Sequence, residues 1–215
     1  MKILKNIIDR LKIQKMNDVN DISKKKILEI AIKDSLKKAI EEIHITNPDF
    51  SEEALRYIVM SELSNYSTFG TFPNTNTNSK TKLVFEKTYY RLKRKKTPFF
   101  RPDISSINEN TNLLAIELKI GKPTKDEPLY DITKCKEYIN LVKGKYSFEL
   151  AASIYAPPHY EKWHAELHQS LDSILNNAKN EGKNINNSQI IIGYIKWGTK
   201  DLFGRQQAKV ITGWI

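Results

Sequence analysis

Two short apolar runs near the middle of the chain constrain its fold most, because both carry charges where a strand is normally uncharged. The runs are FFRPDISSI (99–107) and LLAIELKI (113–120), separated by NENTN. Their alternation and their aromatic and β-branched residues favour strands. The polar residues between them favour a chain reversal. We therefore expect an antiparallel hairpin centred on Asn110.

The reversal places charged residues of the two runs opposite one another. Folding the hairpin about Asn110 sets Asp103 opposite Glu117 and Arg101 opposite Lys119. Directly opposed residues have Cβ atoms about 4.5–5.5 Å apart. Because side chains alternate along a strand, Glu117 and Lys119 share one face and their apolar neighbours take the other.

Two carboxylates on one apolar sheet face repel each other, and their loss of hydration adds to the cost. A cation between Asp103 and Glu117 would offset both effects, and hard oxygen ligands of this kind suit Mg²⁺ or Mn²⁺. Lys119 would then lie beside the metal. The alternative is that both carboxylates point to solvent on a half-exposed sheet, since Asp and Glu do occur in strands.

The same residues carry a family resemblance. Pro102-Asp103, followed after thirteen residues by Glu117-Leu118-Lys119, resembles the signature of the PD-(D/E)XK nuclease superfamily, which has the restriction-endonuclease-like fold. In that family the aspartate and the ExK group lie on adjacent antiparallel strands, with one helix before them and one after. The expected order of elements from residue 51 to about 197 agrees with this arrangement.

The helix expected to begin after Ser51 contains a glutamate in its apolar stripe. Glu62 lies four residues from both Ile58 and Tyr66, and a carboxylate on a buried face needs a partner. Many members of the superfamily carry an acidic ligand on this helix, and Glu62 matches that place. Alternatively, Glu62 is a stripe-edge residue that reaches water or a lysine. Glu52 and Glu53 are poorer candidates because the helix dipole explains acidic residues in a first turn, and Glu86 is a weaker one.

The resemblance implies a metal-dependent endonuclease. Glu62, Asp103, Glu117 and the backbone carbonyl of Leu118 would hold one or two Mg²⁺ (or Mn²⁺), and Lys119 would orient the attacking water or a phosphate oxygen. The implied substrate is DNA, in restriction, repair or phage defence, and a homodimer would explain how both strands are cut. An RNA endonuclease of the same fold, and a non-catalytic nucleic-acid-binding or protein-interaction module that kept the fold, are the alternatives.

Basic residues supply candidate contacts to nucleic acid. The segment YYRLKRKK (89–96) combines tyrosines for base stacking with cations for phosphates; its alternative is an exposed turn kept soluble by charge. On the helix after the hairpin, Lys134 and Tyr138 would face the site, or Lys134 would simply pair with Asp131 on a solvated face. The nucleic-acid candidates are Tyr90, Arg91, Lys93, Arg94 and Lys134.

Composition agrees with a polyanionic partner without identifying one. The net charge is +10 in 215 residues and the pI is near 9.4, but a composition rich in Lys, Ile and Asn can also reflect an AT-rich genome. The single cysteine, Cys135, excludes an intrachain disulfide and fits a reducing cytoplasm. The resemblance implies a protein of prokaryotic or phage type. No apolar run reaches the ~20 residues that span a bilayer, and residues 1–15 do not resemble a signal peptide. His164 and His168 have a helical i, i+4 spacing, but without a third ligand nearby we expect no zinc site.

The fold class expected from these patterns is α/β (α+β), with a central mixed β-sheet flanked by helices and extra N-terminal helices. The resemblance implies that the core is restriction-endonuclease-like. Residues 1–46 would form an N-terminal helical extension and residues 47–215 the nuclease-like domain. The extension would contain two helices separated by a polar break, and a polar loop would occupy residues 67–81. The expected helices are 1–15, 23–44, 51–66, 128–145 and 161–182, and the expected strands are 82–92, 99–107, 113–120, 148–156, 189–198 and 208–215.

Overall fold

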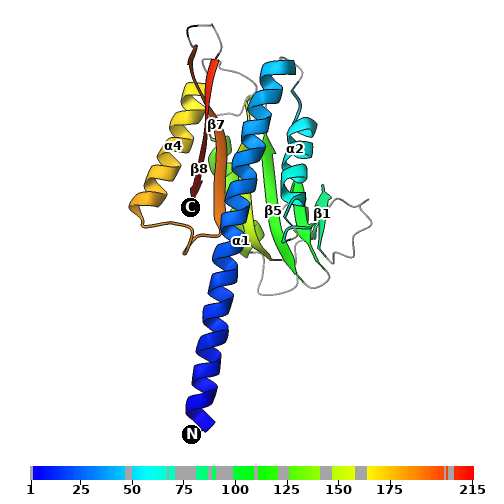
Figure 1. Cartoon of the computed structure of the whole chain (residues 1–215). Helices are drawn as coiled ribbons and strands as arrows, with labels where there is room; N and C mark the ends of the chain where they lie inside the picture. The colour runs from blue at the N-terminus through cyan, green and yellow to red at the C-terminus, as the bar shows by residue number, and fades with distance from the viewer. Residues whose placement is uncertain are drawn as a thin grey trace.

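The chain forms an α/β structure around a six-stranded mixed sheet, seen in a computed structural model (Figure 1). The helices are α1 (Lys2–Thr46), α2 (Glu52–Ser64), α3 (Glu127–Asn140) and α4 (His164–Asn180). The strands are β1 (Lys82–Phe85), β2 (Tyr89–Tyr90), β3 (Phe99–Phe100), β4 (Ile104–Ile107), β5 (Asn112–Lys119), β6 (Phe148–Tyr155), β7 (Ile190–Lys200) and β8 (Gln206–Trp214). The structure describes residues 2–46, 50–66, 68–70, 81–86, 89–90, 99–108, 111–120, 126–140, 147–157, 164–200, 202 and 206–215.

The strand order is β1-β4-β5-β6-β7-β8. Strands β1, β4 and β5 are antiparallel, β5, β6 and β7 are parallel, and β8 returns antiparallel to β7. Helices α3 and α4 lie in the two crossovers that parallel neighbours require. The expectation of a central mixed sheet flanked by helices is therefore confirmed.

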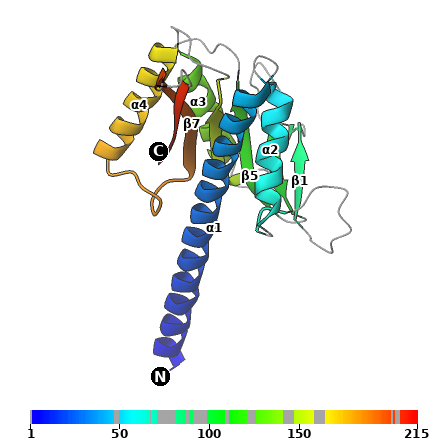
Figure 2. The ribbon, with the colours of Figure 1, turned by 45° about the horizontal axis from the view of Figure 1, so that its top comes forward.

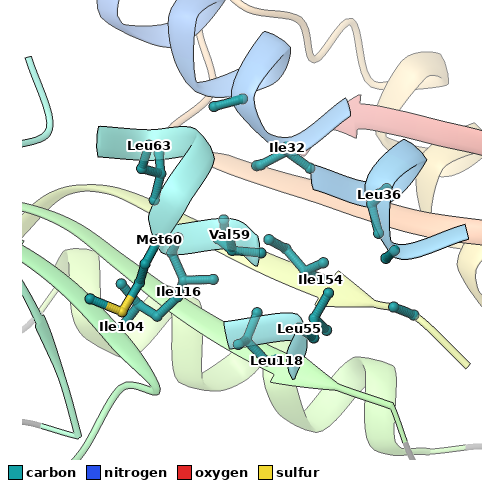
Figure 3. Close-up of a cluster of buried hydrophobic side chains, with 14 of the residues drawn as sticks. Ile32, Leu36, Leu55, Val59, Met60, Leu63, Ile104, Ile116, Leu118 and Ile154 are labelled. Atoms are coloured by element: carbon teal, nitrogen blue, oxygen red, sulfur yellow. The ribbon is translucent and has the colours of Figure 1, made fainter. Parts of the chain in front are cut away.

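Helices α1 and α2 cover one face of the sheet, and Figure 3 shows the apolar cluster that lies between these helices and the sheet. The even-numbered residues of β5 point into this cluster, because side chains alternate between faces along a strand. Ser51 begins α2 as expected: its side chain accepts a hydrogen bond from the backbone N–H of Ala54. The labelled members of the cluster are Ile32, Leu36, Leu55, Val59, Met60, Leu63, Ile104, Ile116, Leu118 and Ile154.

Helices α3 and α4 cover the opposite face (Figure 2). Tyr138 of α3 packs against Ala115 of β5, and Cys135 packs against Ala151 of β6. Glu117 lies on this second face because its position in β5 has the parity of Ala115. The division of β5 into an apolar face and a charged face is thus as the sequence predicted.

The pairing of β4 with β5 follows the expected reversal about Asn110. Ile104 pairs with Ile116 and Ser106 with Leu114, and the register shifts only at Ile107. The hairpin prediction is confirmed over these residues.

The two runs expected to form strands at 82–92 and 99–107 are each interrupted, which corrects the prediction. Pro102, which has no N–H to donate, ends the pairing, so β3 and β4 are separate and β3 pairs with β2 in a small second sheet. At the other break Glu86 has a positive φ of 49°, which ends β1. Arg101 consequently does not pair with Lys119 in the ladder.

Helix α1 is continuous, so the break expected at residues 17–23 is wrong. Asn, Asp and Ser lower helix stability by well under 1 kcal/mol each, and docking of the following turns outweighs such a cost. Leu28, Leu36 and Ile43 of α1 are buried in the main core together with residues of α2 and the sheet. The expected domain boundary at residue 46 would therefore separate α1 from a core to which it contributes. The N-terminal part of α1 extends beyond the sheet (Figure 1).

Gly193 of β7 permits the close approach of α1. A Cβ at this position would lie 2.5 Å from the Ile32 side chain and 3.2 Å from that of Leu36. The second half of α1 is therefore fitted to the sheet.

Candidate functional site

Asp103 lies between Pro102 and the first residue of β4, at the end of the hairpin. Its Oδ2 accepts a hydrogen bond from the backbone N–H of Leu118 at 2.7 Å. This N–H faces β4 at the level of Pro102, where the ladder has ended. The carboxylate of Asp103 therefore takes a place that a backbone carbonyl would occupy in a longer strand.

The carbonyl of Leu118 faces the same side. The carbonyl of Lys119 accepts a hydrogen bond at 2.8 Å from the backbone N–H of Ala156, the residue after β6. Successive carbonyls along a strand point toward opposite neighbouring strands. Leu118 thus directs both its N–H and its C=O toward Pro102, which has no N–H to offer. This geometry keeps the Leu118 carbonyl, one of the expected metal ligands, beside Asp103.

Glu117 is almost fully buried, with 3% of its surface exposed. Lys134 Nζ lies 2.8 Å from its Oε2, and the hydroxyl of Tyr138 donates a hydrogen bond to its Oε1. Both partners come from α3, one helical turn apart, which is the face that the sequence suggested for them. Glu117 is thus held by a cation and a phenol.

Burial raises the pKa of both carboxyl groups, and the charge of Asp103 also raises that of Glu117. For Asp103, loss of hydration raises the pKa, and the Leu118 N–H opposes this effect. For Glu117, burial raises the pKa and the charge of Asp103 raises it further, against the lowering effect of Lys134. The structure therefore brings Asp103 and Glu117 within electrostatic reach of each other on one face, as the hairpin predicted, and neither faces open solvent.

Lys119 lies at the end of β5 on the same face. Its Nζ is 3.7 Å from Glu127 Oε1 at the start of α3, and its side chain is 29% exposed. Its charge lowers the pKa of both Asp103 and Asp131. Lys119 is consequently a cation at the rim of the carboxylate pair.

Glu62 is not part of this group. Its carboxylate, buried under α1, forms an ion pair with Lys38. The alternative interpretation, a stripe-edge glutamate that reaches a lysine, describes this contact. Sequence spacing could not distinguish the two, because the partner comes from another helix that crosses α2.

Glu52, in the first turn of α2, interacts electrostatically with Asp103, whereas Glu62 is paired with Lys38. The negative charge of Asp103 raises the pKa of Glu52, second only to burial, and Lys119 lowers it. Glu62 is ten residues further along α2, about 15 Å at 1.5 Å per residue. The first turn of α2 therefore faces the carboxylate pair, and the dipole argument that set Glu52 aside was incomplete.

An ion-pair network adjoins the site on the β1 side. Arg56 Nη2 lies 3.5 Å from Glu52 and 3.3 Å from Glu86, and Arg101 lies 3.6 Å from Glu86. The backbone N–H of Glu86 also donates to the carbonyl of Asp103 at 3.1 Å. This network fixes the chain on both sides of Asp103.

Asp131 is a second acidic residue that the sequence analysis did not place in the site. It is fully buried; its Oδ2 accepts from the Tyr155 hydroxyl at 3.3 Å, and its Oδ1 lies 3.4 Å from Lys134 Nζ. Burial raises its pKa, against the effect of Lys134. The sequence feature that could have identified Asp131 is its position three residues before Lys134, the lysine that contacts Glu117.

The donor set of the candidate site is made of oxygen atoms. Asp103, Glu117, Glu52 and the Leu118 carbonyl are ligands that suit Mg²⁺ or Mn²⁺ rather than a soft metal. Within the described part of the chain, no group of three or more His, Cys, Asp or Glu side chains is already close enough to hold a metal ion. The pair formed by Asp103 and Glu117, with the carbonyl beside it, fits the metal by chemistry, whereas Glu52 would have to approach.

Most of the expected nucleic-acid contacts lie outside the described residues. This applies to Arg91, Lys93 and Arg94, while Tyr90 is described only by the backbone of β2. Lys134 is directed into the site, toward Glu117, rather than out toward a solvated surface.

A shallow groove of about 560 Å³ lies between α4 and β7, apart from the carboxylate pair. Three of its lining residues are paired: Asp172 accepts from Tyr194 and Lys196, and His168 Nε2 contacts the carbonyl of Ile195 at 3.2 Å. Burial lowers the pKa of His168. These contacts attach α4 to the sheet, as expected for a packing helix.

Comparison of the chain with protein-family models, with curated proteins and with solved structures gives no match. Within the described residues, no helix is long and apolar enough to cross a membrane.

Proposed function

We propose that the chain is a metal-dependent nuclease of the PD-(D/E)XK kind that hydrolyses the phosphodiester bonds of DNA. The observation that carries this proposal is the pair formed by Asp103 and Glu117 at the end of the hairpin. Both carboxyl groups have a raised pKa, and the charge of Asp103 contributes to that of Glu117. Two buried carboxylates kept in such proximity favour a site for a divalent cation.

The arrangement around the pair supports the same proposal. Helix α2 precedes the antiparallel strands β1, β4 and β5, and α3 follows them and leads to the parallel strand β6. This order agrees with the resemblance of the Pro102-Asp103 and Glu117-Leu118-Lys119 residues to the superfamily signature.

In the proposed reaction each residue has a defined task. Asp103, Glu117 and the Leu118 carbonyl hold Mg²⁺ or Mn²⁺, and Glu52 completes the set. The bound metal lowers the pKa of a coordinated water and stabilises the charge that develops on the phosphate. Lys119, at the rim, orients the water or a phosphate oxygen.

The test is cleavage of labelled DNA and RNA by the purified protein with Mn²⁺, compared with a Lys119→Met variant. We expect this variant to lose activity by about 10²–10³-fold, because a positioned donor at the reacting phosphate has about this effect. Lys183→Met, at an exposed lysine beyond α4, is the matched control and should cleave like the unmodified chain. Cleavage of RNA alone would replace the proposed substrate, and cleavage that persists in Lys119→Met would exclude the proposed role of this lysine.

One observation favours a different function, a non-catalytic module that kept the fold. Glu117 already has two close partners on α3, Lys134 and Tyr138. If Mn²⁺ neither raises the Tm nor supports cleavage of either nucleic acid, the module is the better interpretation. A rise in Tm with Mn²⁺ that disappears in Asp103→Asn would contradict it.

A further inference from the structure

Lys134 lies between two buried carboxylates on different elements. Its Nζ is 2.8 Å from Glu117 Oε2 on β5 and 3.4 Å from Asp131 Oδ1, three residues earlier on α3. Although burial opposes the charged form, Glu117 and then Asp131 raise the pKa of Lys134 above its usual value. The lysine is therefore a permanent cation at neutral pH, closer to Glu117 than to Asp131.

The contact with Asp131 is incomplete. Asp131 is 0% exposed. Its Oδ1 forms no hydrogen bond within the described residues, whereas Oδ2 accepts from Tyr155. Lys134 Nζ, 3.4 Å away, forms an ion pair with Oδ1 but no hydrogen bond, so this oxygen is a ready acceptor for an ammonium group that moves toward it.

A divalent cation and the ammonium of Lys134 compete for Glu117. Both are positive and both need the same carboxylate, so a metal beside Glu117 repels Lys134. The side chain of Lys134 has four rotatable bonds, and Asp131 lies on the same helix at i−3. A small movement of Nζ is then enough to exchange one acceptor for the other, with no shift of α3.

We propose that Asp131 is a positioning residue that receives Lys134 when a divalent cation binds to Glu117. In the metal-free protein Lys134 neutralises Glu117, and in the metal-bound protein it completes the hydrogen bonding of Asp131. This inference rests on the proposed function, because it concerns how the same site accepts its metal.

The competition has opposite consequences for the two residues. Without Lys134, no lysine competes with the metal for Oε2 of Glu117, so Mn²⁺ should bind more tightly. Without the charge of Asp131, the displaced ammonium has no acceptor, so it stays on Glu117 and Mn²⁺ should bind more weakly. The effect of Asp131 on metal affinity should therefore depend on the presence of Lys134.

The experiment is a double-mutant cycle in which Mn²⁺ binding is measured by calorimetry, without nucleic acid. The four proteins are the unmodified chain, Lys134→Met, Asp131→Asn and the double variant. We expect Lys134→Met to bind Mn²⁺ about tenfold tighter and Asp131→Asn about tenfold weaker, a factor of ten corresponding to 1.4 kcal/mol. In the Lys134→Met background, Asp131→Asn should change the affinity by only about two- to threefold, the residual attraction of a nearby negative charge.

Two controls separate this role from a structural one. Lys136→Met changes an exposed lysine of the same helix and should leave the affinity for Mn²⁺ unchanged. Thermal unfolding of each metal-free protein verifies its fold, and Lys134→Met should lower the Tm because Glu117 loses its cation. Asn at position 131 can still accept from Tyr155, so this variant should remain folded.

The outcomes distinguish the inference from the proposed function. If Lys134→Met binds Mn²⁺ no more tightly than the unmodified chain, or if Asp131→Asn weakens binding equally in both backgrounds, the inference is wrong while the proposed metal site stands. If none of the four proteins binds Mn²⁺, both are wrong. Binding seen only after Lys134 is replaced would support the inference strongly.

Discussion

The carboxylate of Asp103 is held at the cost of lost hydration, and the hydrogen bond that it accepts from the Leu118 N–H opposes this effect only in part. A raised pKa means that the native state stabilises the neutral form of the group relative to the charged form. This arrangement agrees better with the proposed role of Asp103 as a metal ligand than with a purely structural role, because functional sites commonly lower the stability of a protein.

Asp103→Asn should raise the stability of the metal-free protein. The amide removes the charge next to Glu117, and its oxygen can still accept from the Leu118 N–H. We expect the Tm to rise by about 2–4 °C, the shift that about 1 kcal/mol produces in a chain of this size, measured by calorimetry with a chelator present. Asp126→Asn, at an exposed position before α3, is the control and should leave the Tm unchanged. A lower Tm for Asp103→Asn would show that this carboxylate stabilises the fold.

At the scale of the elements, the site depends on where β4 begins. Pro102 ends the pairing with β5, so the backbone of Leu118 is available to the Asp103 carboxylate at the end of the strand. Helix α3 then brings Lys134 and Tyr138 over Glu117 from the second face. Each element supplies one or two groups, and the sheet fixes the distances between them.

Helix α1 is a structural element of the domain rather than an appendage. Leu36→Ala should lower the free energy of unfolding by about 2–5 kcal/mol, because Leu36 is fully buried in the main core and its loss leaves a cavity beside Gly193. Lys37→Ala, at the exposed neighbouring position, should change it by less than about 0.5 kcal/mol. Denaturant unfolding followed by circular dichroism measures both. Equal effects of the two substitutions would mean that α1 does not pack as described.

At the scale of the whole molecule, the buried carboxylates make stability depend on pH. Burial raises the pKa of Asp103, Glu117 and Asp131 above the ordinary values of 3.8 and 4.5. Groups with a raised pKa contribute stability below their unfolded-state pKa, and this contribution is lost as the pH rises through the folded-state value. Lys134 remains protonated in both states across this window, so it does not change the sign.

As the pH rises above the ordinary carboxyl values of 3.8 and 4.5, these three groups should therefore lower the stability of the metal-free protein. His168, whose pKa is lowered from 6.5, acts in the opposite sense, because the unfolded chain takes up its proton first as the pH falls. At still lower pH the trend should reverse, because Glu29 and Asp172 have lowered pKa values, and their contribution is lost as the pH falls through them. Thermal unfolding across this range, with chelator and with Mn²⁺, measures the effect. Mn²⁺ should remove most of the decline toward neutral pH. If the Tm of the metal-free protein does not fall relative to that of Asp103→Asn as the pH rises, the assignment of these carboxylates is contradicted.

Local physics in the sequence was enough for the hairpin and for most of the elements. Turn residues around Asn110 and the alternation of LLAIELKI specify register and faces, because both depend on neighbours in the chain. The same reasoning placed Asp103, Glu117 and Lys119 together. The expectation that Lys134 and Tyr138 face the site came from the family resemblance, with a solvated helix face as its alternative. The local reasoning failed at Pro102, whose missing donor outweighed the β-propensity of the residues around it.

Only the tertiary structure decided which acidic residues join the pair. Glu62 and Glu52 lie on one helix, and their roles depend on where α1 crosses α2 and on how near the first turn of α2 comes to Asp103. Asp131 likewise became part of the site only through the docking of α3. Periodicity assigns a residue to the face of a helix, but the partner opposite that face comes from a segment far away in the chain, and packing between elements fixes that partner.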